Sequence, residues 1–307
     1  VERIVPMKIG VLLGGISPER DVSLKSGNAI ISACQQLGHD VVKIDPKDGI
    51  SYLLKKIESV DLVFNGLHGG DGENGVIQGL LQSMGKRFTG SNNESSAICM
   101  DKRVSKALVS RKNILTPNWV SIDSEEKIPT NIGIDYPLVV KPNDQGSTIG
   151  LTVVKSNKEL EEAVTLAREY TKVVLIEAFV PGREITVTIV GNKAYPIVEI
   201  IPMNDLYDYE CKYTKGMAEY PCPAEISNKL TVKIQNIALM IHKLLGCRHY
   251  SRVDFILDEE LNSWFLELNT LPGMTETSLI PKSVGAAGMD FKMLIQSIID
   301  ESLKDSC

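Results

Sequence analysis

The sequence predicts an α/β protein with an N-terminal doubly wound domain followed by two α+β lobes. Over about the first ninety residues, short apolar runs alternate with segments of helical periodicity, a pattern typical of parallel strands joined by helices. Further along, β-rich runs are separated by a compact turn, which indicates antiparallel strands. A chain of 307 residues has room for two or three domains of about 100 to 150 residues. We expect these domains at residues 1–92, 93–180 and 181–307.

The N-terminal domain is predicted to contain three pairs of a strand and a helix. We expect the strands at residues 8–13, 40–44 and 62–64. The first and third helices are each followed by a glycine, Gly38 and Gly85, and glycine commonly ends a helix. Because each strand is followed by a helix, we expect the sheet of this domain to be parallel.

The two lobes are predicted to mix helices with antiparallel strands. Helices are expected at residues 93–112, 158–170 and 226–245, and strands at residues 119–122, 138–141, 173–179, 184–190, 194–201, 251–257 and 264–269. The pair Pro181-Gly182 suits a boundary between the lobes. Residues 202–224 are polar and show no periodicity, so we expect a long loop that closes over a site.

Charge and composition argue against several classes of partner. The formal net charge is -6 and no basic stripe is present, so we expect neither a nucleic acid nor a membrane surface as partner. The densest basic stretch, residues 102–112, has a helical rhythm and predicts a solvated helix face, apart from Lys102. Six scattered cysteines without CxxC spacing are typical of reduced thiols. We therefore expect a cytoplasmic protein.

The strongest chemical signal lies in the last two predicted strands. Because side chains alternate along a strand, Arg252 and Asp254 share one face, and so do Glu267 and Asn269. A turn centred on residues 260–261 would place Asp254 opposite Glu267. Carboxylate and amide oxygens suit Mg²⁺, which usually keeps waters and substrate phosphates among its ligands. The alternative is an ordinary amphipathic hairpin with a wet outer face.

A glycine-rich segment, KPNDQGSTIG at residues 141–150, is the second signal. Its amide groups and hydroxyls can cover phosphate oxygens, and Lys141 supplies a positive charge. The segment is neither a Walker A loop nor a dinucleotide-binding fingerprint. Taken alone it could equally be a surface hairpin.

The order of these residues resembles that of ATP-grasp enzymes. Lys141 precedes the glycine-rich loop, Glu177 and Glu184 flank the tripeptide PGR, and the predicted metal ligands come last. Seven segments are similar, in order, to blocks of D-alanine:D-alanine ligases: GGISPERDVSLKSG, LHGGDGENGVIQGLL, MDK, KPNDQGST, YDYECKY, RVDF and ELNTLPGMTETSLIP. They span about residues 8 to 282. The resemblance implies an ATP-grasp fold, in which the two α+β lobes clasp ATP.

The resemblance also implies roles for single residues on the nucleotide side. Lys102 and Lys141 would contact the ATP phosphates, and Lys212 would face the transferred phosphate. Glu177 would lie on the adenine side, and Glu184 would bind the ribose hydroxyls. The metal ligands would be Asp254, Glu267 and Asn269, which would hold two Mg²⁺ or Mn²⁺ ions.

On the substrate side, the resemblance implies two D-alanine molecules as substrates. Glu19 would accept the ammonium of the first D-alanine, with Ser147 and Tyr213 hydrogen-bonded to Glu19, and His68 would lie near the carboxylate. Arg252 and the Gly273 amide would stabilise the tetrahedral oxyanion. Ser278 would hold the carboxylate of the second D-alanine. The family also implies a homodimer.

The implied reaction is the ATP-dependent formation of D-alanyl-D-alanine, through an acyl phosphate, for bacterial peptidoglycan precursors. Alternatives are a D-alanine:D-lactate ligase, another carboxylate-amine ligase, or a nucleotide-binding regulatory protein without turnover. Tyr213 distinguishes the first alternative, and an intact set of metal ligands with Arg252 argues against the last. Considered singly, His68 could be a turn histidine, Glu19 a helix-terminal charge and Tyr213 an exposed loop aromatic.

Overall fold

The computed structural model describes residues 5–129, 131–202, 217–275 and 277–305. The N-terminal domain is built on a parallel sheet with strand order β2-β1-β3. Its strands are β1 (Lys8–Leu12), β2 (Asp40–Ile44) and β3 (Leu62–Asn65), and its helices are α1 (Arg20–Gln36), α2 (Ile50–Glu58) and α3 (Val76–Ser83). The predicted alternation of strands and helices is confirmed. Apolar side chains such as Ile9, Val11 and Phe64 are fully buried in this sheet.

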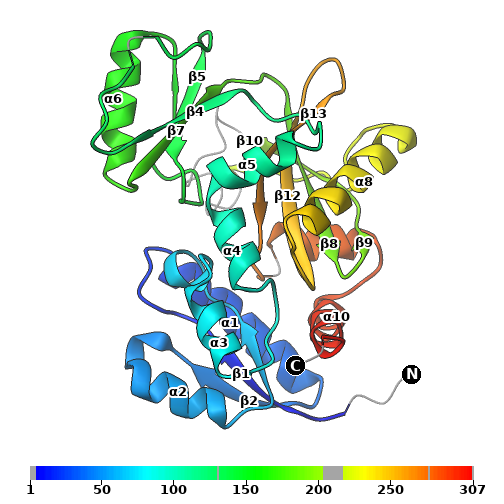
Figure 1. Ribbon diagram of the computed structural model, residues 1–307. Helices are drawn as coiled ribbons and strands as arrows, with labels where there is room; N and C mark the ends of the chain where they lie inside the picture. The colour runs from blue at the N-terminus through cyan, green and yellow to red at the C-terminus, as the bar shows by residue number, and fades with distance from the viewer. Residues whose placement is uncertain (1–4, 130, 203–216, 276, 306–307) are drawn as a thin grey trace.

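The end of the chain returns to this first domain. Helix α9 (Leu279–Ala286) is followed by α10 (Phe291–Leu303), which packs against α1 (Figure 1). Ile295 and Ile298 of α10 share one buried cluster with Ile30 of α1. Contacts between the two ends of the chain therefore stabilise the N-terminal domain. The division at residues 92 and 180 stays a prediction.

The central lobe is a four-stranded antiparallel sheet with order β4-β7-β5-β6. Its strands are β4 (Trp119–Asp123), β5 (Leu138–Pro142), β6 (Thr152–Val154) and β7 (Val173–Ala178). Helix α6 (Asn157–Arg168) covers one face of the sheet (Figure 1) and buries Leu160, Ala163 and Ala167 against it. The side chain of Ser156 caps this helix by accepting a hydrogen bond from the amide of Glu159.

Two helices occupy the segment for which the sequence predicts one. Helix α4 (Asn93–Met100) ends at Asp101, and α5 (Lys102–Ser110) begins directly after it. Asp101 is extended, and its side chain accepts a 3.0 Å hydrogen bond from the amide of Val104. The single helix over residues 93–112 was therefore wrong, because Asp101 caps a new helix. The break places Lys102 in the first turn of α5.

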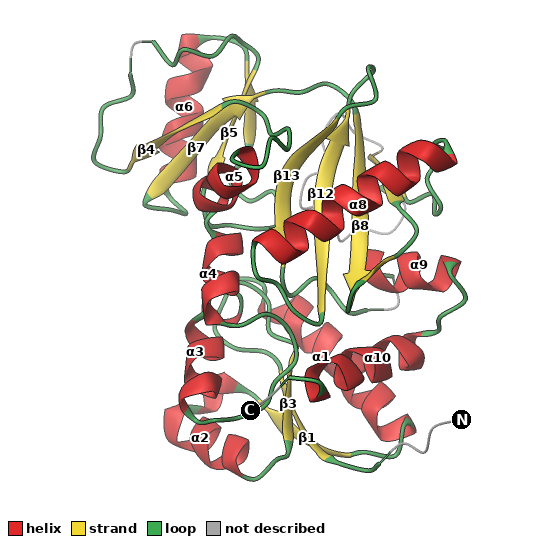
Figure 2. Cartoon of the chain, turned by 45° about the vertical axis from the view of Figure 1, so that its right-hand side comes forward, coloured by secondary structure: helices red, strands yellow, loops and turns green. Residues whose placement is uncertain are grey.

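The C-terminal lobe is a six-stranded sheet with β11-β10-β8-β12-β13 in order and β9 paired to β8. Its strands are β8 (Arg183–Val190), β9 (Lys193–Ala194), β10 (Val198–Pro202), β11 (Ala218–Glu219), β12 (Tyr250–Leu257) and β13 (Ser263–Asn269). Helix α8 (Asn228–Leu244) crosses one face of this sheet (Figure 2). It buries Ile234 and Ile241 against the strands, so the other face is left for the site.

The register of β12 and β13 confirms the predicted pairing of Asp254 with Glu267. A β-bulge follows at once, because Phe255 pairs with Phe265 and leaves Leu266 unpaired. Strict alternation along the predicted strand would place Leu266 on the apolar face, opposite to Glu267, and this expectation was wrong. The bulge turns Leu266 toward a cavity, while Phe265 is fully buried.

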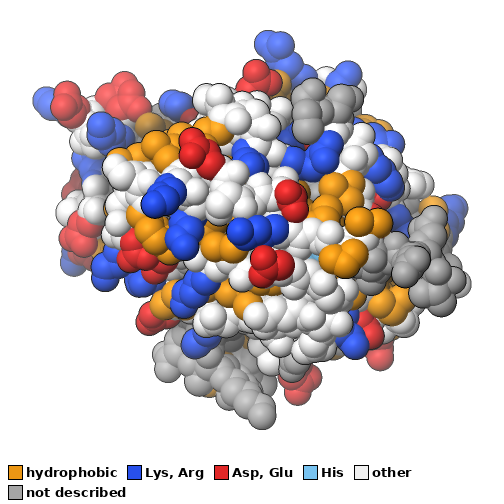
Figure 3. Space-filling view, turned by 90° about the horizontal axis from the view of Figure 1, so that it is seen from below, with side chains coloured by type: hydrophobic (Ala, Val, Ile, Leu, Met, Phe, Trp, Pro, Cys, Tyr) orange, Lys and Arg blue, Asp and Glu red, His pale blue; other side chains and the backbone are white. Residues whose placement is uncertain are grey.

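The surface seen from below carries charges of both signs. Lys and Arg side chains lie among Asp and Glu side chains on this face, with hydrophobic groups between them (Figure 3). Among the described residues, none of the helices is both long and apolar enough to span a bilayer.

Candidate active site

Two adjoining cavities lie where the three units meet. The larger encloses about 420 Å³ and is lined by residues of the N-terminal domain, the C-terminal lobe and the glycine-rich loop. The smaller encloses about 150 Å³ and is lined by both lobes. Gly146, Ser147, Arg252 and Glu267 line both cavities. Ligands bound in the two cavities would therefore lie next to each other, on either side of these four residues.

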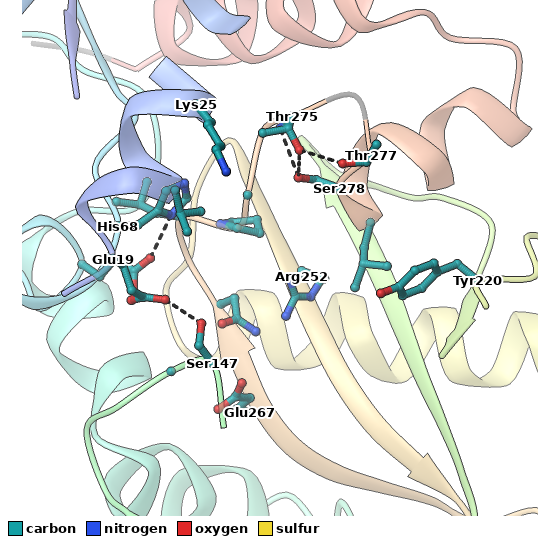
Figure 4. A pocket seen from close by; sticks show the side chains of 18 residues that line it. Glu19, Lys25, His68, Ser147, Tyr220, Arg252, Glu267, Thr275, Thr277 and Ser278 are labelled. Carbon is teal, nitrogen blue, oxygen red and sulfur yellow. Dashed lines mark hydrogen bonds and ion pairs between the residues drawn. The ribbon is translucent and has the colours of Figure 1, made fainter. Parts of the chain in front are cut away.

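The acidic end of the larger cavity is formed by Glu19, which directly precedes α1. Ser147 of the glycine-rich loop donates a 2.6 Å hydrogen bond to Glu19 Oε1 (Figure 4). His68 is buried beside them, with Nε2 3.0 Å from Ser26 Oγ and Nδ1 3.5 Å from Glu73 Oε1. Two carboxylates with an oriented imidazole suit the ammonium group of an amino acid.

The opposite end of the larger cavity is formed by the loop that precedes α9. Ser278 lies directly before α9, and its Oγ lies 2.8 Å from Thr275 Oγ1. A Cβ atom on Gly273 would lie only 3.0 Å from Ser278 Oγ, so glycine allows this close approach. Hydroxyl groups at a helix N-terminus are suited to a carboxylate. The larger cavity thus has an acidic end and an anion-binding end.

The smaller cavity has lysines on one side. Lys102 Nζ donates a 2.7 Å hydrogen bond to the carbonyl of Gln145 and lies 3.1 Å from Glu267 Oε2. Lys141 of β5 and Glu184 of β8 also line this cavity. Two ammonium groups beside a glycine-rich loop suit a polyphosphate.

Glu177 of β7 lines neither cavity and is instead buried between two lysines. Lys141 donates a short hydrogen bond to Glu177 Oε1, and Lys106 Nζ lies 2.8 Å from Glu177 Oε2. Burial lowers the pKa of Lys106 to about 8, although the Glu177 carboxylate raises it. Burial raises the pKa of Glu177, but the two lysines outweigh burial and the net shift is downward. The solvated face predicted for residues 102–112 was wrong at Lys106, whose exposure is 0%.

The predicted metal ligands converge on β12 and β13. Asp254 accepts hydrogen bonds from Arg252 Nε at 2.9 Å, from Thr186 Oγ1 at 2.5 Å and from Asn269 Nδ2 at 2.9 Å. Glu267 pairs across the strands with Asp254. Within the described ranges, no group of three or more His, Cys, Asp or Glu side chains could hold a metal ion. The predicted set differs from such a group because it has two carboxylates and one amide. Such oxygen donors fit Mg²⁺ when phosphate oxygens and waters complete its shell.

The glycine-rich loop holds two residues in a conformation that side chains seldom adopt. Ser147 has φ 55° and Thr148 has φ 62°. Residues other than glycine in this region cost on the order of 1 to 3 kcal/mol each and cluster at functional sites. The hydrogen bond from Ser147 to Glu19 helps to hold this loop over the two cavities.

The structure brings thirteen of the fifteen predicted site residues to these cavities or to the Glu177 cluster beside them. The other two, Lys212 and Tyr213, lie outside the described residues. Sequence reasoning missed Lys106, and it also missed several residues that line the larger cavity: Lys25, Glu73, Tyr220, Thr275 and Thr277. Lys106 follows Lys102 by one helical turn, and this spacing is the signal that could have identified it.

Two family models match the chain. One, described as D-ala D-ala ligase C-terminus, matches residues 107–300, and one described as D-ala D-ala ligase N-terminus matches residues 47–91. The D-alanine–D-alanine ligase of Aquifex aeolicus is 44% identical over 293 residues, which cover 95% of this chain and 100% of the relative. That of Halalkalibacterium halodurans is 43% identical, with 97% and 100% covered.

Solved structures agree with these relatives. D-alanine–D-alanine ligase from Bacillus anthracis, complexed with ATP, matches with a TM-score of 0.87 at 34% identity, covering 97% of this chain and 98% of that one. VanG D-Ala:D-Ser ligase from Enterococcus faecalis matches with a TM-score of 0.83 at 29% identity, covering 97% and 100%. The predicted ATP-grasp fold is confirmed. This chain belongs to the D-alanine–D-alanine ligase family.

Proposed function

We propose that this protein joins two D-alanine molecules into D-alanyl-D-alanine, using ATP and releasing ADP and phosphate, for bacterial cell-wall precursors. The observation that carries this proposal is the pair of adjoining cavities with Arg252 at their junction. A polyphosphate site and an amino-acid site that meet at one guanidinium suit transfer of a phosphoryl group to a carboxylate. Relatives that are D-alanine–D-alanine ligases and match 95% and 97% of this chain support the same activity.

The smaller cavity is the proposed ATP site. Lys102, Lys141 and Glu184 line it. The two lysines would contact phosphate oxygens, and Glu184 would contact the ribose. Asp254, Glu267 and Asn269 would hold two Mg²⁺ or Mn²⁺ ions. Bound there, the ions would offset the negative charge of the phosphates. Glu177 lines neither cavity, so its proposed place on the adenine side rests on the family resemblance alone.

The larger cavity is the proposed site for both D-alanine molecules. The ammonium of the first would bind Glu19, with His68 close to its carboxylate. An oxygen of that carboxylate attacks the γ-phosphorus, ADP leaves, and an acyl phosphate forms. The ammonium of the second D-alanine loses one proton and the resulting amine attacks the acyl carbon. Phosphate then leaves, and the nitrogen loses a second proton to give the amide. Arg252 and the Gly273 amide would stabilise the oxyanion that forms in the second step.

The second substrate is the point at which related activities diverge. Ser278 and the N-terminus of α9 can hold the carboxylate of D-alanine, D-serine or D-lactate, because all three share this group. VanG D-Ala:D-Ser ligase from Enterococcus faecalis has a similar fold. Tyr213 and Lys212 remain proposed contacts of the closing loop. The homodimer and the cytoplasmic location also stay predictions.

Product analysis tests the proposal directly. The purified protein is supplied with ATP, Mg²⁺ and D-alanine, alone or with an equal amount of D-serine or D-lactate, and L-alanine serves as the control acceptor. We expect phosphate release and D-alanyl-D-alanine as the main product, with little turnover on L-alanine. Mostly mixed products would favour a D-alanine:D-serine or D-alanine:D-lactate ligase. ATP binding without phosphate release under any condition would favour the regulatory protein.

A further inference from the structure

We propose that Lys106 is a positioning residue for the nucleotide: it neutralises Glu177 permanently and so leaves Lys141 free to bind phosphate. This inference rests on the proposed function, because it assigns how the ATP site keeps its positive charge. The three residues come from α5, β5 and β7, and two ion pairs join them beside the smaller cavity, which Lys141 lines. Lys106 touches neither cavity, so its effect on a ligand has to pass through the other two residues.

The geometry divides one carboxylate between two ammonium groups. Glu177 Oε1 accepts a hydrogen bond from Lys141, and Lys106 Nζ lies 2.8 Å from Glu177 Oε2. Glu177 is 2% exposed and Lys106 is 0% exposed, so water cannot replace either contact. Lys141 lines the smaller cavity, although it is largely buried. Of the three residues, only Lys141 lines a cavity.

The charges of this cluster explain why two lysines are needed. Glu177 alone with Lys141 would form a neutral pair, and a buried ammonium paired with a carboxylate is costly to separate. Lys106 adds one positive charge, so the cluster carries a net charge of about +1 toward the cavity. A phosphate oxygen can then bind Lys141 while Glu177 keeps Lys106 as its partner. Burial lowers the pKa of Lys106 to about 8, so it is mostly protonated at neutral pH.

The hydrogen bonds that hold the start of α5 in place support the same role. Asn143, next to β5, accepts a 2.8 Å hydrogen bond from the amide of Arg103 and a 3.2 Å hydrogen bond from the amide of Lys102. These contacts tie the first turn of α5 to the start of the glycine-rich loop. Lys102 and Lys106 are four positions apart and lie on one face of the helix. The helix therefore presents one lysine to the cavity and a second lysine to Glu177 beneath it.

The test compares ATP with adenosine as probes of direct binding by calorimetry. Lys106→Met should weaken ATP binding about ten-fold or more and leave adenosine binding within about two-fold, because only ATP uses the charge. The KM for ATP should rise with it, while the KM for D-alanine stays within about two-fold. Lys112→Met is the matched control, since it removes a positive charge from an exposed position just beyond α5. This control should bind ATP as the native protein does.

Two further variants keep the test decisive. Lys106→Arg retains the charge and should keep ATP binding closer to native than Lys106→Met does. Should Lys106→Met fail to fold, Lys106→Gln retains a hydrogen-bond donor to Glu177 without the charge and should show the same selective loss for ATP. Native ATP affinity in Lys106→Met, or equal losses for ATP and adenosine in the variant that folds, would overturn the inference. Turnover of D-alanine by the native protein is measured separately. Failure of the proposed function can therefore be distinguished from failure of this inference.

Discussion

Ser147 and Glu19 are 128 positions apart in the sequence and are joined by a 2.6 Å hydrogen bond. Ser147 belongs to the glycine-rich loop of the central lobe, whereas Glu19 directly precedes α1 of the N-terminal domain. The same loop covers the smaller cavity and borders the larger one. This hydrogen bond therefore links the proposed ATP site to the proposed site of the first D-alanine.

Ser147→Ala is expected to raise the KM for the first D-alanine by roughly ten-fold or more, because a hydrogen bond to a charged group contributes about 1.5 to 3 kcal/mol. Alanine is the suitable replacement, since glycine would also relax the positive φ of this position. Steady-state kinetics with D-alanine varied at saturating ATP measure the effect. Ser59→Ala, which removes an exposed hydroxyl after α2, should behave as native. A native KM in Ser147→Ala would show that the link does not act on the substrate.

Glu267→Gln is expected to abolish ATP turnover and to leave the melting temperature nearly unchanged. The side chain faces the cavity and contributes little to packing, whereas its charge is required at the proposed metal site. Phosphate release is measured over a titration of Mg²⁺ and then of Mn²⁺. Glu259→Gln, an exposed carboxylate in the turn after β12, is the control. Activity within a few-fold of native in Glu267→Gln would refute the metal assignment.

Arg252→Ala is expected to lower kcat by about 10² or more, with a smaller effect on ATP affinity. Arg252 lies at the junction of the two cavities, where charge would develop in the transition state (Figure 4). Rapid-quench and steady-state measurements separate kcat from ATP binding. Arg111→Ala, an exposed arginine at the end of α5, controls for the loss of a charge. An unchanged kcat with a much higher KM for ATP would place Arg252 at the nucleotide instead.

The convergence of β12 and β13 could be predicted because it depends on local patterns. Alternation of polar and apolar residues set the faces of both strands, and a short turn set their register, so Asp254 was correctly placed opposite Glu267. The bulge at Leu266 could not be predicted this way. A bulge adds one residue to one strand, and the sequence does not show which strand carries it.

The burial of Lys106 was also beyond the sequence. Helical spacing shows that Lys106 and Lys102 share a face, but it does not show that Lys106 is fully buried beside Glu177 of β7. The same holds for α10, whose packing against α1 joins residues near both ends of the chain. Such features arise from contacts between distant elements, which periodicity within one element cannot reveal.

Burial of His242 is expected to make the stability of the protein sensitive to mild acid. It is buried near the end of α8, with Nδ1 2.7 Å from Ser251 Oγ. Burial, together with the positive charges of Lys243 and His249, lowers its pKa from 6.5 to about 4. Below pH 6.5 the unfolded chain therefore binds a proton that the folded protein does not. The free energy of unfolding should fall as the pH drops from 6.5 to about 4, by up to about 3 kcal/mol from this residue.

His242→Gln keeps a polar group beside Ser251 and removes this titration. We expect urea unfolding at several pH values between 4 and 7 to show a weaker loss of stability in this variant than in the native protein. Lys233→Gln, an exposed position on the same helix, changes the net charge without adding or removing a group that titrates in this range. Its pH dependence should match that of the native protein. If His242→Gln instead loses stability with pH as steeply as the native protein, then other groups, of which His249 is the nearest with a lowered pKa, cause the acid sensitivity.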